Sequence, residues 1–459
     1  MKTEFTVKRE GNTRLILIFA GWGSDANLYK NIEVPGWDTL VSFDYDGKPF
    51  PEELLAGYTT IYLFAWSLGV AASVTFLDNS VITKRIAING TTNPVSDNYG
   101  IPVAIFNGTE QTLNERNLNK FRLRMAGSKA IFDSITPLLP INPDIEELKR
   151  QLRLFGTLSL STSSAKGKIQ WDRVYISDND MIFPSDNQSA AWDRENVAET
   201  IHLDSPHYID LKQIISGSIP NLQKVAGSFS KADESYESHA SAQFKIAEKL
   251  LQMIPQQTRQ PLRILEIGPG SGSFTRLYAE KFHPESITYV DLYPIRRHNL
   301  APIEIYHVGD AEEFIASTDE KWDLILSAST IQWFVNLPVF FRNARRCLTE
   351  GGMLCCSTFL PDNLKELRAA RPSTLLYPSA AELSAMIGEV FDEVTSDTLA
   401  IDIEFKNARE ALEHLKSTGV GSAHNNERSF SGRQKNGSAL TILSENPTLH
   451  YSAFLFTAR

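Results

Sequence analysis

The most constraining feature of the sequence is a glycine-rich turn in the second half of the chain. Residues 263–267 are expected to form a strand, and Gly268, Gly270 and Gly272 follow it at alternate positions. Glycine lets the backbone approach a ligand closely and turn sharply from a strand into a helix. A nicotinamide or flavin fold needs the spacing G-x-G-x-x-G, which would place its third glycine where Ser273 stands. The pattern therefore disfavours those folds.

Acidic residues around this turn indicate an S-adenosylmethionine site instead. Glu266 lies two residues before Gly268, and G-x-G-x-G with this preceding acid is typical of class I methyltransferases. Asp291 ends the next expected strand, 286–291, where an acid hydrogen-bonds the ribose hydroxyls of a bound nucleotide. Each acid taken singly is as readily a helix cap or a loop residue.

The third and fourth expected strands end in residues that continue the same site. Asp310 and Ala311 follow the run 303–308, where methyltransferases place a carboxylate near the adenine amino group. Ser327 ends the run 322–327 and would face the transferred methyl group. Because all these positions fall at strand ends, we predict that they bind the cofactor together. The predicted set is Glu266, Gly268, Gly270, Gly272, Asp291, Asp310, Ala311 and Ser327.

The first half of the chain contains a second, separate series of short apolar runs. The expected strands are 15–20, 39–43, 59–65, 85–89, 102–106 and 173–176. Buried strands that alternate with helices indicate a mostly parallel sheet with helices on both faces. Residues 110–165 are polar, basic and helical in pattern, which predicts a small cap over the sheet. The cap cations are Arg116, Lys120, Arg122, Arg124, Lys149, Arg150 and Arg153.

The length of 459 residues fits two α/β domains of ordinary size. We expect a first domain at 1–215, a linker at 216–228 and a second domain at 229–459. The net charge of −10 argues against a nucleic-acid-binding protein. No apolar run is long enough to span a membrane, and the three cysteines fit neither a disulfide framework nor a zinc site. We therefore expect a cytoplasmic protein with no metal site.

A nucleophile elbow is the chemical feature of the first half. Ser67 stands in Ala65-Trp66-Ser67-Leu68-Gly69, at the expected junction of a strand and a helix. A serine at this sharp turn is strained and exposes its hydroxyl above the sheet, provided that small residues flank it. Ala65 replaces the first glycine of the strict motif, so the pentapeptide alone is equally consistent with an ordinary helix N-cap.

Two later residues complete a predicted triad in the order that this fold uses. Asp180 follows the run 173–176, and His207 lies further on, after Pro206. His207 would accept the Ser67 proton, and Asp180 would hold the tautomer of the imidazole. Asp178 and His202 are the rival acid and base. We prefer Asp180, because an acid four residues before a proline after a strand is the usual setting, and we interpret His202 as structural.

The same reaction needs two backbone N–H groups that bind the developing oxyanion. Leu68 follows the nucleophile and would supply one of them. Trp22 lies in the Gly21-Trp22-Gly23 loop after the first strand and would supply the other. The alternative for this loop is a tight turn with a packing tryptophan.

The first half resembles the compact type of pimeloyl-[acyl-carrier-protein] methyl ester esterases of biotin synthesis. The resemblance rests on Phe19–Gly23, on the Trp66–Gly69 elbow, on Asp180–Pro184 with Asn187 and Gln188, and on Pro206 with His207. It covers about residues 1–215 and implies that Ser67, Asp180 and His207 cleave the methyl ester of pimeloyl-carrier protein. It also gives the basic cap a reason, because acyl carrier proteins are acidic.

The second half resembles malonyl-[acyl-carrier-protein] O-methyltransferases of the same pathway. The resemblance rests on Phe229, Tyr236, Ala240 and Gln243, on Ser329–Trp333, and on Ser357–Phe359 with Asn363 and Leu364. A carboxylate is already a nucleophile, so methylating it requires alignment and exclusion of water rather than a general base. The candidates for positioning the substrate are Tyr236, His239, Gln332 and Trp333.

The two resemblances imply opposite reactions on one chain. One half would cap malonyl-carrier protein as a methyl ester with S-adenosylmethionine, and the other would later remove the cap from pimeloyl-carrier protein. Two alternatives remain open at this stage. The chain could join a general carboxylesterase to a small-molecule methyltransferase, or its first half could be a silent module that docks acyl carrier protein.

Overall fold

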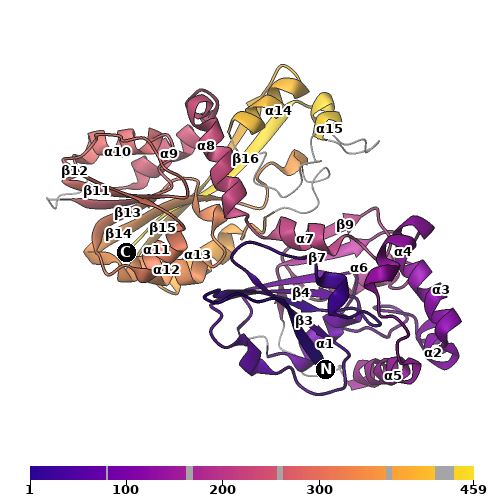
Figure 1. The fold of residues 1–459 in the computed structure, drawn as a ribbon. Coiled ribbons are helices and arrows are strands. Elements are labelled where there is room, and N and C mark those ends of the chain that lie inside the picture. The colour runs from indigo at the N-terminus through magenta and orange to yellow at the C-terminus, as the bar shows by residue number, and fades with distance from the viewer. Residues whose placement is uncertain (79–80, 162–168, 256–261, 368–374, 419–438) are drawn as a thin grey trace. The chain divides into compact units, whose positions relative to one another are not determined.

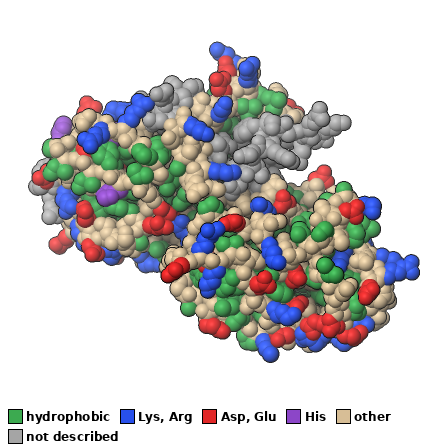
Figure 2. Space-filling view, in the orientation of Figure 1, with side chains coloured by type: hydrophobic (Ala, Val, Ile, Leu, Met, Phe, Trp, Pro, Cys, Tyr) green, Lys and Arg blue, Asp and Glu red, His purple; other side chains and the backbone are tan. Residues whose placement is uncertain are grey.

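The computed structural model describes residues 1–78, 81–161, 169–255, 262–367, 375–418 and 439–459. Of residues 159–161 and 232–239 only the backbone is described. The chain divides into two compact units, Met1–Ser216 and Gly217–Arg459, and each contains its own seven-stranded sheet (Figure 1). Hydrophobic, acidic and basic side chains are interspersed on the face of each unit that Figure 2 shows.

The sheet of the first unit has the order β1-β3-β2-β4-β5-β7-β9. Only β1 is antiparallel to its neighbour, and the remaining pairs are parallel. The strands are β1 (Lys2–Val7), β2 (Arg14–Phe19), β3 (Asp38–Phe43), β4 (Thr60–Trp66), β5 (Lys84–Ile88), β7 (Arg173–Ser177) and β9 (Thr200–Leu203). The order reverses at β2, so loops after β2 and β4 lie side by side at one edge, where α/β sheets bind ligands.

Helices of the first unit pack around this sheet, and α2–α5 gather on one side of it as the cap (Figure 1). The helices are α1 (Leu68–Phe76), α2 (Val103–Thr112), α3 (Glu115–Ala126), α4 (Lys129–Ile135), α5 (Ile145–Ser161), α6 (Ser185–Trp192) and α7 (Leu211–Ser218). Short elements are η1 (Ala26–Tyr29), η2 (Glu52–Leu55), η4 (Thr136–Leu138), β6 (Gln170–Trp171) and β8 (Asn196–Val197).

The prediction of a strand at 102–106 was wrong, because this segment begins helix α2. Pro102 is the N-cap residue, and its carbonyl accepts the first helical bond from the Phe106 N–H. A proline at a helix start loses nothing, since the first N–H groups have no partner within the helix. Val103 and Ile105 are exposed while Phe106 is buried. A short apolar run does not by itself distinguish a strand from this helix.

The sheet of the second unit has the order β12-β11-β10-β13-β14-β16-β15. The strands are β10 (Arg263–Ile267), β11 (Ser286–Asp291), β12 (Ile303–Val308), β13 (Trp322–Ser327), β14 (Leu348–Phe359), β15 (Val394–Glu404) and β16 (Thr448–Ala458). The first five in the sheet are parallel, and β16 runs antiparallel to both β14 and β15. The order reverses at β10, which places the glycine turn after β10 at the switch point.

Helices cover both faces of this sheet. Their buried apolar side chains form two clusters together with those of the strands. The helices are α8 (Leu222–His239), α9 (Ser241–Met253), α10 (Ser273–Phe282), α11 (Ala311–Ser317), α12 (Leu337–Arg346), α13 (Ala380–Gly388), α14 (Ala408–Ser417) and α15 (Ala439–Glu445), with η5 (Ile331–Trp333) and η6 (Lys365–Leu367). Residues 216–228, where we expected a linker, are largely helical because α7 ends and α8 begins there. The division between the units falls after Ser216.

We predict that alanine substitution has opposite effects on stability at two helical glycines of the first unit. A Cβ at Gly69 in α1 would lie 2.2 Å from the Phe19 carbonyl oxygen, whereas a Cβ at Gly108 in α2 meets no atom within 4 Å. We expect Gly69→Ala to destabilise the unit by at least about 1–3 kcal/mol, as overpacking does. Gly108→Ala should stabilise it by about 0.5–1 kcal/mol through lower chain entropy.

Urea unfolding of the full chain, with hydrogen exchange of peptides from β2 and α1 to locate the change, measures both effects. Equal stability of the two variants would contradict the close approach of β2 and α1.

Candidate active and cofactor sites

The first site begins at the junction of β4 and α1, where the backbone of Ser67 is strained. Ser67 has φ 58° and ψ −128°, a conformation that an L-residue rarely adopts. Small residues permit the turn: a Cβ at Gly69 would strike Phe19, and a Cβ at Gly90 would lie 2.2 Å from the Ser67 carbonyl oxygen. The elbow thus needs a glycine on α1 and another after β5, and the sequence analysis recognised only the first.

The structure brings the three predicted triad residues together. The Ser67 Oγ lies 3.0 Å from His207 Nε2, and His207 Nδ1 lies 2.7 Å from Asp180 Oδ2. All three side chains are buried, and the His207 ring stacks on Phe183 with centroids 6.0 Å apart. A serine, a histidine and an acid in this order of contacts form a nucleophile, a general base and an orienting carboxylate.

The Asp180 carboxylate is held by donors other than His207. Its Oδ1 accepts hydrogen bonds from the backbone N–H groups of Ile182 and Phe183 at 2.7 and 2.9 Å. Its Oδ2 also accepts from Gln188 Nε2 at 3.1 Å. These three hydrogen bonds fix the orientation of the buried carboxylate toward the imidazole.

The rival acid and base pair with each other away from the site. His202 Nδ1 lies 2.8 Å from Asp178 Oδ1, and both side chains are about half exposed. His202 is in β9, and Asp178 follows β7. The structure therefore separates the two Asp–His pairs, and only the pair of Asp180 and His207 contacts a serine of the elbow.

A narrow apolar cavity opens in front of Ser67. Its volume is about 30 Å³, and Trp22 and Leu68 line it beside the serine, in the places where we expected the oxyanion donors. The Trp22 indole donates to the Leu148 carbonyl at 3.0 Å and packs edge-on against Phe121. Both contacts reach cap helices, so the loop is tied to the cap. The other lining residues are Ile101, Ile105, Phe106, Thr109, Phe121, Arg124, Leu152, Met181 and Ile182.

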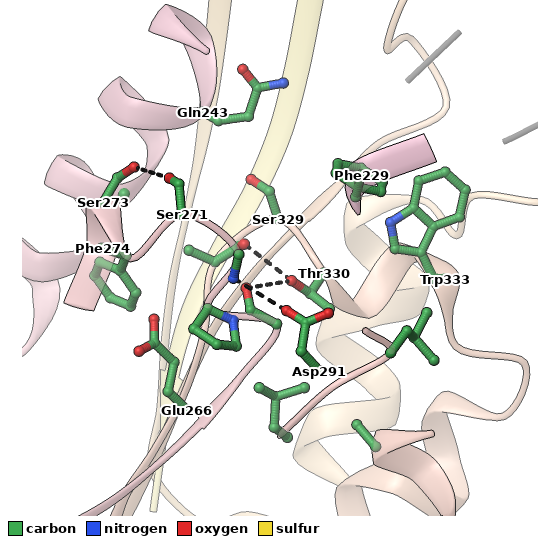
Figure 3. A pocket seen from close by; sticks show the side chains of 18 of the residues that line it. Phe229, Gln243, Glu266, Ser271, Ser273, Phe274, Asp291, Ser329, Thr330 and Trp333 are labelled. Carbon is green, nitrogen blue, oxygen red and sulfur yellow. Dashed lines mark hydrogen bonds between the residues drawn. The ribbon is translucent and has the colours of Figure 1, made fainter. Parts of the chain in front are cut away.

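The second site is a larger pocket at the switch point of the second sheet (Figure 3). Its volume of about 530 Å³ is in the range of small-molecule sites. The predicted residues Glu266, Gly268, Gly270, Asp291, Asp310 and Ala311 line it, as does Trp333. Gly268 has φ 70°, and a Cβ there would lie 2.2 Å from Thr330 Oγ1. A glycine is required at this point by conformation and by space.

The acidic residues of this pocket differ in what they contact. Asp291 Oδ2 accepts a hydrogen bond from the Gly270 N–H at 3.2 Å, so the carboxylate faces the glycine turn. Asp310 caps α11, because its carboxylate accepts a hydrogen bond from the Glu312 N–H at 2.9 Å. Asp310 is therefore both a helix cap and a residue of the pocket wall. Glu266 is buried and accepts from Thr275 Oγ1 and Tyr278 Oη, both at 2.7 Å. Burial raises the pKa of the Glu266 carboxyl to about 7.

Three predicted residues lie outside the lining of the pocket. Ser327 is fully buried and donates to the Ile267 carbonyl at 3.0 Å, so it joins β13 to β10 instead of facing a ligand. Gly272 lies against the His298 ring, and a Cβ there would be 2.5 Å from it. Gln332 donates to the Ser329 carbonyl. The residues that follow Ser327, namely Ala328, Ser329 and Thr330, line the pocket in its place.

Aromatic side chains and one amide complete the pocket wall. Trp333 packs edge-on against Phe229 at a centroid distance of 6.2 Å. Gln243, in the first turn of α9, is 8% exposed, and within the described part of the chain its Oε1 has no hydrogen-bond partner. Figure 3 shows it above Ser271 and Ser273, at the end of the pocket away from Asp291. Tyr236 and His239 lie in α8, but their side chains fall outside the described residues.

A buried polar atom without a partner is costly, so an amide like that of Gln243 indicates a ligand group at this place. The glycine turn, the acid at the end of β11 and this amide together fit a nucleoside joined to a polar chain. The sequence analysis named Gln243 only within a resemblance, because a single glutamine in a helix has no pattern of its own.

Comparison with known proteins gives matches for both halves. The family model described as pimeloyl-ACP methyl esterase BioG matches residues 1–213, and a methyltransferase domain model matches residues 236–395. A malonyl-[acyl-carrier protein] O-methyltransferase of Bacteroides fragilis is 36% identical over 421 residues, which cover 88% of this chain and 84% of that protein. The chain belongs to the malonyl-[acyl-carrier protein] O-methyltransferase family.

Two further matches cover the first half of the chain alone. An uncharacterized protein of Haemophilus influenzae is 33% identical over 210 residues, 46% of this chain and 94% of that protein. A crystal structure of BioG from Haemophilus influenzae is 32% identical, covers 46% of this chain and 94% of that chain, and has a TM-score of 0.41. The two family models and the Bacteroides fragilis relative confirm the predicted fusion of a biotin-synthesis esterase with a methyltransferase, and the chain is an enzyme with both domains. Within the described residues, no helix combines the length and the apolar character of a membrane span.

The two Asp–His pairs provide a matched test of the first site. We expect Asp180→Asn to lower kcat for hydrolysis of a p-nitrophenyl ester by about 10³–10⁴-fold, because the imidazole loses the carboxylate that fixes its tautomer. Asp178→Asn should change kcat by less than about twofold, since its partner His202 does not contact Ser67. A loss in the Asp178 variant equal to that in the Asp180 variant would refute this assignment.

Proposed function

We propose that this chain performs two reactions of biotin synthesis on acyl carrier protein. The second unit would methylate the free carboxyl of malonyl-carrier protein with S-adenosylmethionine, and the first unit would hydrolyse the methyl ester of pimeloyl-carrier protein. The observation that carries the proposal is the hydrogen-bonded array of Ser67, His207 and Asp180 on a chain that matches a malonyl-carrier-protein methyltransferase over 84% of that protein's length.

Ester hydrolysis follows from the geometry of the first site. His207 Nε2 accepts the Ser67 proton as Oγ attacks the ester carbonyl carbon, and the backbone N–H groups of Leu68 and Trp22 stabilise the oxyanion. The imidazolium then protonates the departing methoxide, which leaves as methanol. A water molecule, deprotonated by the same imidazole, attacks the acyl-serine. The acyl–oxygen bond then breaks, the imidazolium returns its proton to Ser67 Oγ, and the pimeloyl carboxylate is released. Asp180 stays ionised throughout and stabilises the imidazolium.

Methyl transfer does not require a general base from the second unit. S-adenosylmethionine supplies an electrophilic methyl group when bound, and the malonyl carboxylate is the nucleophile. Gly268 and Gly270 would let the backbone approach the cofactor, Asp291 would take the ribose hydroxyls, and Asp310 would lie at the adenine end. Ser329, Thr330 and Trp333 line the pocket after β13, where they would orient the carboxylate and exclude water.

The cap supports acyl carrier protein as the partner of the first unit. Three of its predicted cations, Arg116, Lys120 and Arg124, are exposed at four-residue spacing on one face of α3. Lys149, Arg150 and Arg153 instead pair with glutamates, and Arg122 is buried. An exposed row of cations suits an acidic partner. The cap would also select chain length, because Phe106, Phe121 and Leu152 line the cavity beside Ser67.

The three cysteines are buried free thiols, which supports a cytoplasmic location.

Esterification would hide the malonyl carboxylate from the apolar sites of chain elongation, where a buried charge is costly. Elongation intervenes between the two reactions, so the two units need not pass an intermediate directly between them.

Parallel assays of wild type and Ser67→Ala test the proposal. We expect Ser67→Ala to lose hydrolysis of pimeloyl-carrier-protein methyl ester by at least about 10³-fold, because the nucleophile is removed. Methyl transfer from S-adenosylmethionine to malonyl-carrier protein should be unchanged in the same preparation, since Ser67 lies in the other unit.

Each alternative outcome would contradict a specific part of the proposal. Hydrolysis that survives in Ser67→Ala would overturn the triad. No hydrolysis by the wild type would favour a silent docking module, and equal activity on free and carrier-bound esters would favour a general carboxylesterase. Equal hydrolysis of malonyl and pimeloyl esters would refute chain-length selection by the cap.

We predict that removal of the Gln243 amide weakens the binding of some ligands of this pocket and not of others. We expect it to bind the amino-acid end of the cofactor, together with the hydroxyls of Ser271 and Ser273 and the cation of Arg276 in the same wall. Gln243→Leu should weaken binding of S-adenosylhomocysteine by about 10-fold, the cost of one hydrogen bond to a charged group. It should leave methylthioadenosine, which lacks that end, unaffected. Calorimetric titration of both ligands measures this, and equal losses for the two ligands would contradict the placement.

A further inference from the structure

Asn89 is a fully buried side chain that the reaction does not use directly, and it contacts the peptide of the general base. It follows β5 with φ 46°, in the left-handed region that asparagine tolerates better than most residues. Its Nδ2 donates to the His207 carbonyl oxygen at 2.7 Å and to Ser177 Oγ at 2.8 Å. Its Oδ1 accepts from the Ser177 N–H at 2.8 Å.

These contacts join three segments that are distant in sequence. The Asn89 backbone N–H donates to the Tyr175 carbonyl at 2.9 Å, which continues the pairing of β5 with β7. The side chain spans from the end of β7 at Ser177 to the loop of His207, and the Ser67 N–H donates to the Ile88 carbonyl one residue before Asn89. Residues 88 and 89 therefore hold the nucleophile and the base from the same strand end.

We propose that Asn89 is a positioning residue for ester hydrolysis, which fixes the peptide of His207 so that Nε2 stays within reach of Ser67. This inference rests on the triad proposed above. His207 lies in a loop, and its carbonyl receives a second, longer hydrogen bond of 3.4 Å from the Trp66 indole. Of the two donors to this carbonyl, Asn89 makes the shorter hydrogen bond and ties the peptide to the end of β5. The N–H of the same peptide, that of Tyr208, donates to the Met125 carbonyl in α3 at 2.9 Å.

The chemistry of the amide explains why asparagine suits this position. Its two N–H groups donate to acceptors on different segments, and its oxygen accepts a hydrogen bond from a backbone N–H. Every polar group of the side chain therefore has a hydrogen-bond partner. An aspartate has the same shape and also tolerates the left-handed backbone, but its ionised form cannot donate to His207. A displacement of about 1 Å in a catalytic group can cost about 100-fold in rate.

The test compares Asn89→Gly and Asn89→Asp with Thr91→Val in the full chain, with pimeloyl-carrier-protein methyl ester as substrate. Thr91 is equally buried two residues away, and its hydroxyl donates to the Asn93 carbonyl rather than to His207. We expect both Asn89 variants to lose about 10–100-fold in kcat, with KM within about threefold of wild type, because alignment is impaired and substrate contacts are not. Thr91→Val should retain kcat within about twofold.

The pH profile supplies a readout that loss of packing would not change. In Asn89→Asp, the introduced carboxyl can donate to the His207 carbonyl while it is protonated, and it cannot once it is ionised. The activity of Asn89→Asp relative to wild type should therefore fall as pH rises, whereas the relative activity of Asn89→Gly should be independent of pH.

Unfolding by urea and methyl transfer by the second unit are measured on the same preparations. Wild-type kcat in a folded Asn89→Gly or Asn89→Asp would overturn the inference, and so would an equal loss in Thr91→Val or a flat pH ratio for Asn89→Asp. Ser67→Ala is included because hydrolysis that survives in it refutes the triad itself. The two failures are therefore distinguishable.

Discussion

Both units depend on one constraint, the close approach of backbone segments where a central parallel strand ends. In the first unit, Ser67 adopts a strained conformation over Gly69 and Gly90, which leave no room for a Cβ. In the second, Gly268 turns against Thr330 in the same way. A reversal of strand order opens space at these two points, so each turn presents its chemistry to a crevice rather than to the core.

The surroundings of each turn then determine what it can do. In the first unit, loops after β5, β7 and β9 carry Asn89, Asp180 and His207 to the serine, and the cap closes an apolar cavity in front of it. In the second unit, the pocket is larger and polar at one end, and its acids are held by neutral donors and helix N–H groups. The geometry of the first unit thus suits activation of a nucleophile, and that of the second suits alignment of two ligands.

Several parts of the fold and of the sites follow from local sequence. The runs at β2, β4, β10, β11 and β13 are of strand length and largely apolar, and the serine turn follows β4 directly, as the glycine turn follows β10. Other parts do not have a local signal. The segment at 102–106 is apolar but begins a helix after Pro102, and Ser327 points into the sheet while its neighbours face the pocket. A shift of one residue reverses the direction of a side chain in a strand, and sequence patterns do not fix ends that finely.

The sequence by itself determined the two families, the serine elbow, the glycine turn and the presence of an acid and a histidine in the order that this fold uses, because these depend on residue type and spacing along the chain. Only the tertiary structure decided which acid pairs with which histidine, since Asp178 and Asp180 are two residues apart but face different partners. It also revealed Asn89 and Gln243, single polar side chains whose significance is their burial and their contacts with segments distant in sequence. Hydrogen-bond partners across a fold are set by how strands are ordered in the sheet, and that order is not encoded in any short stretch of the chain.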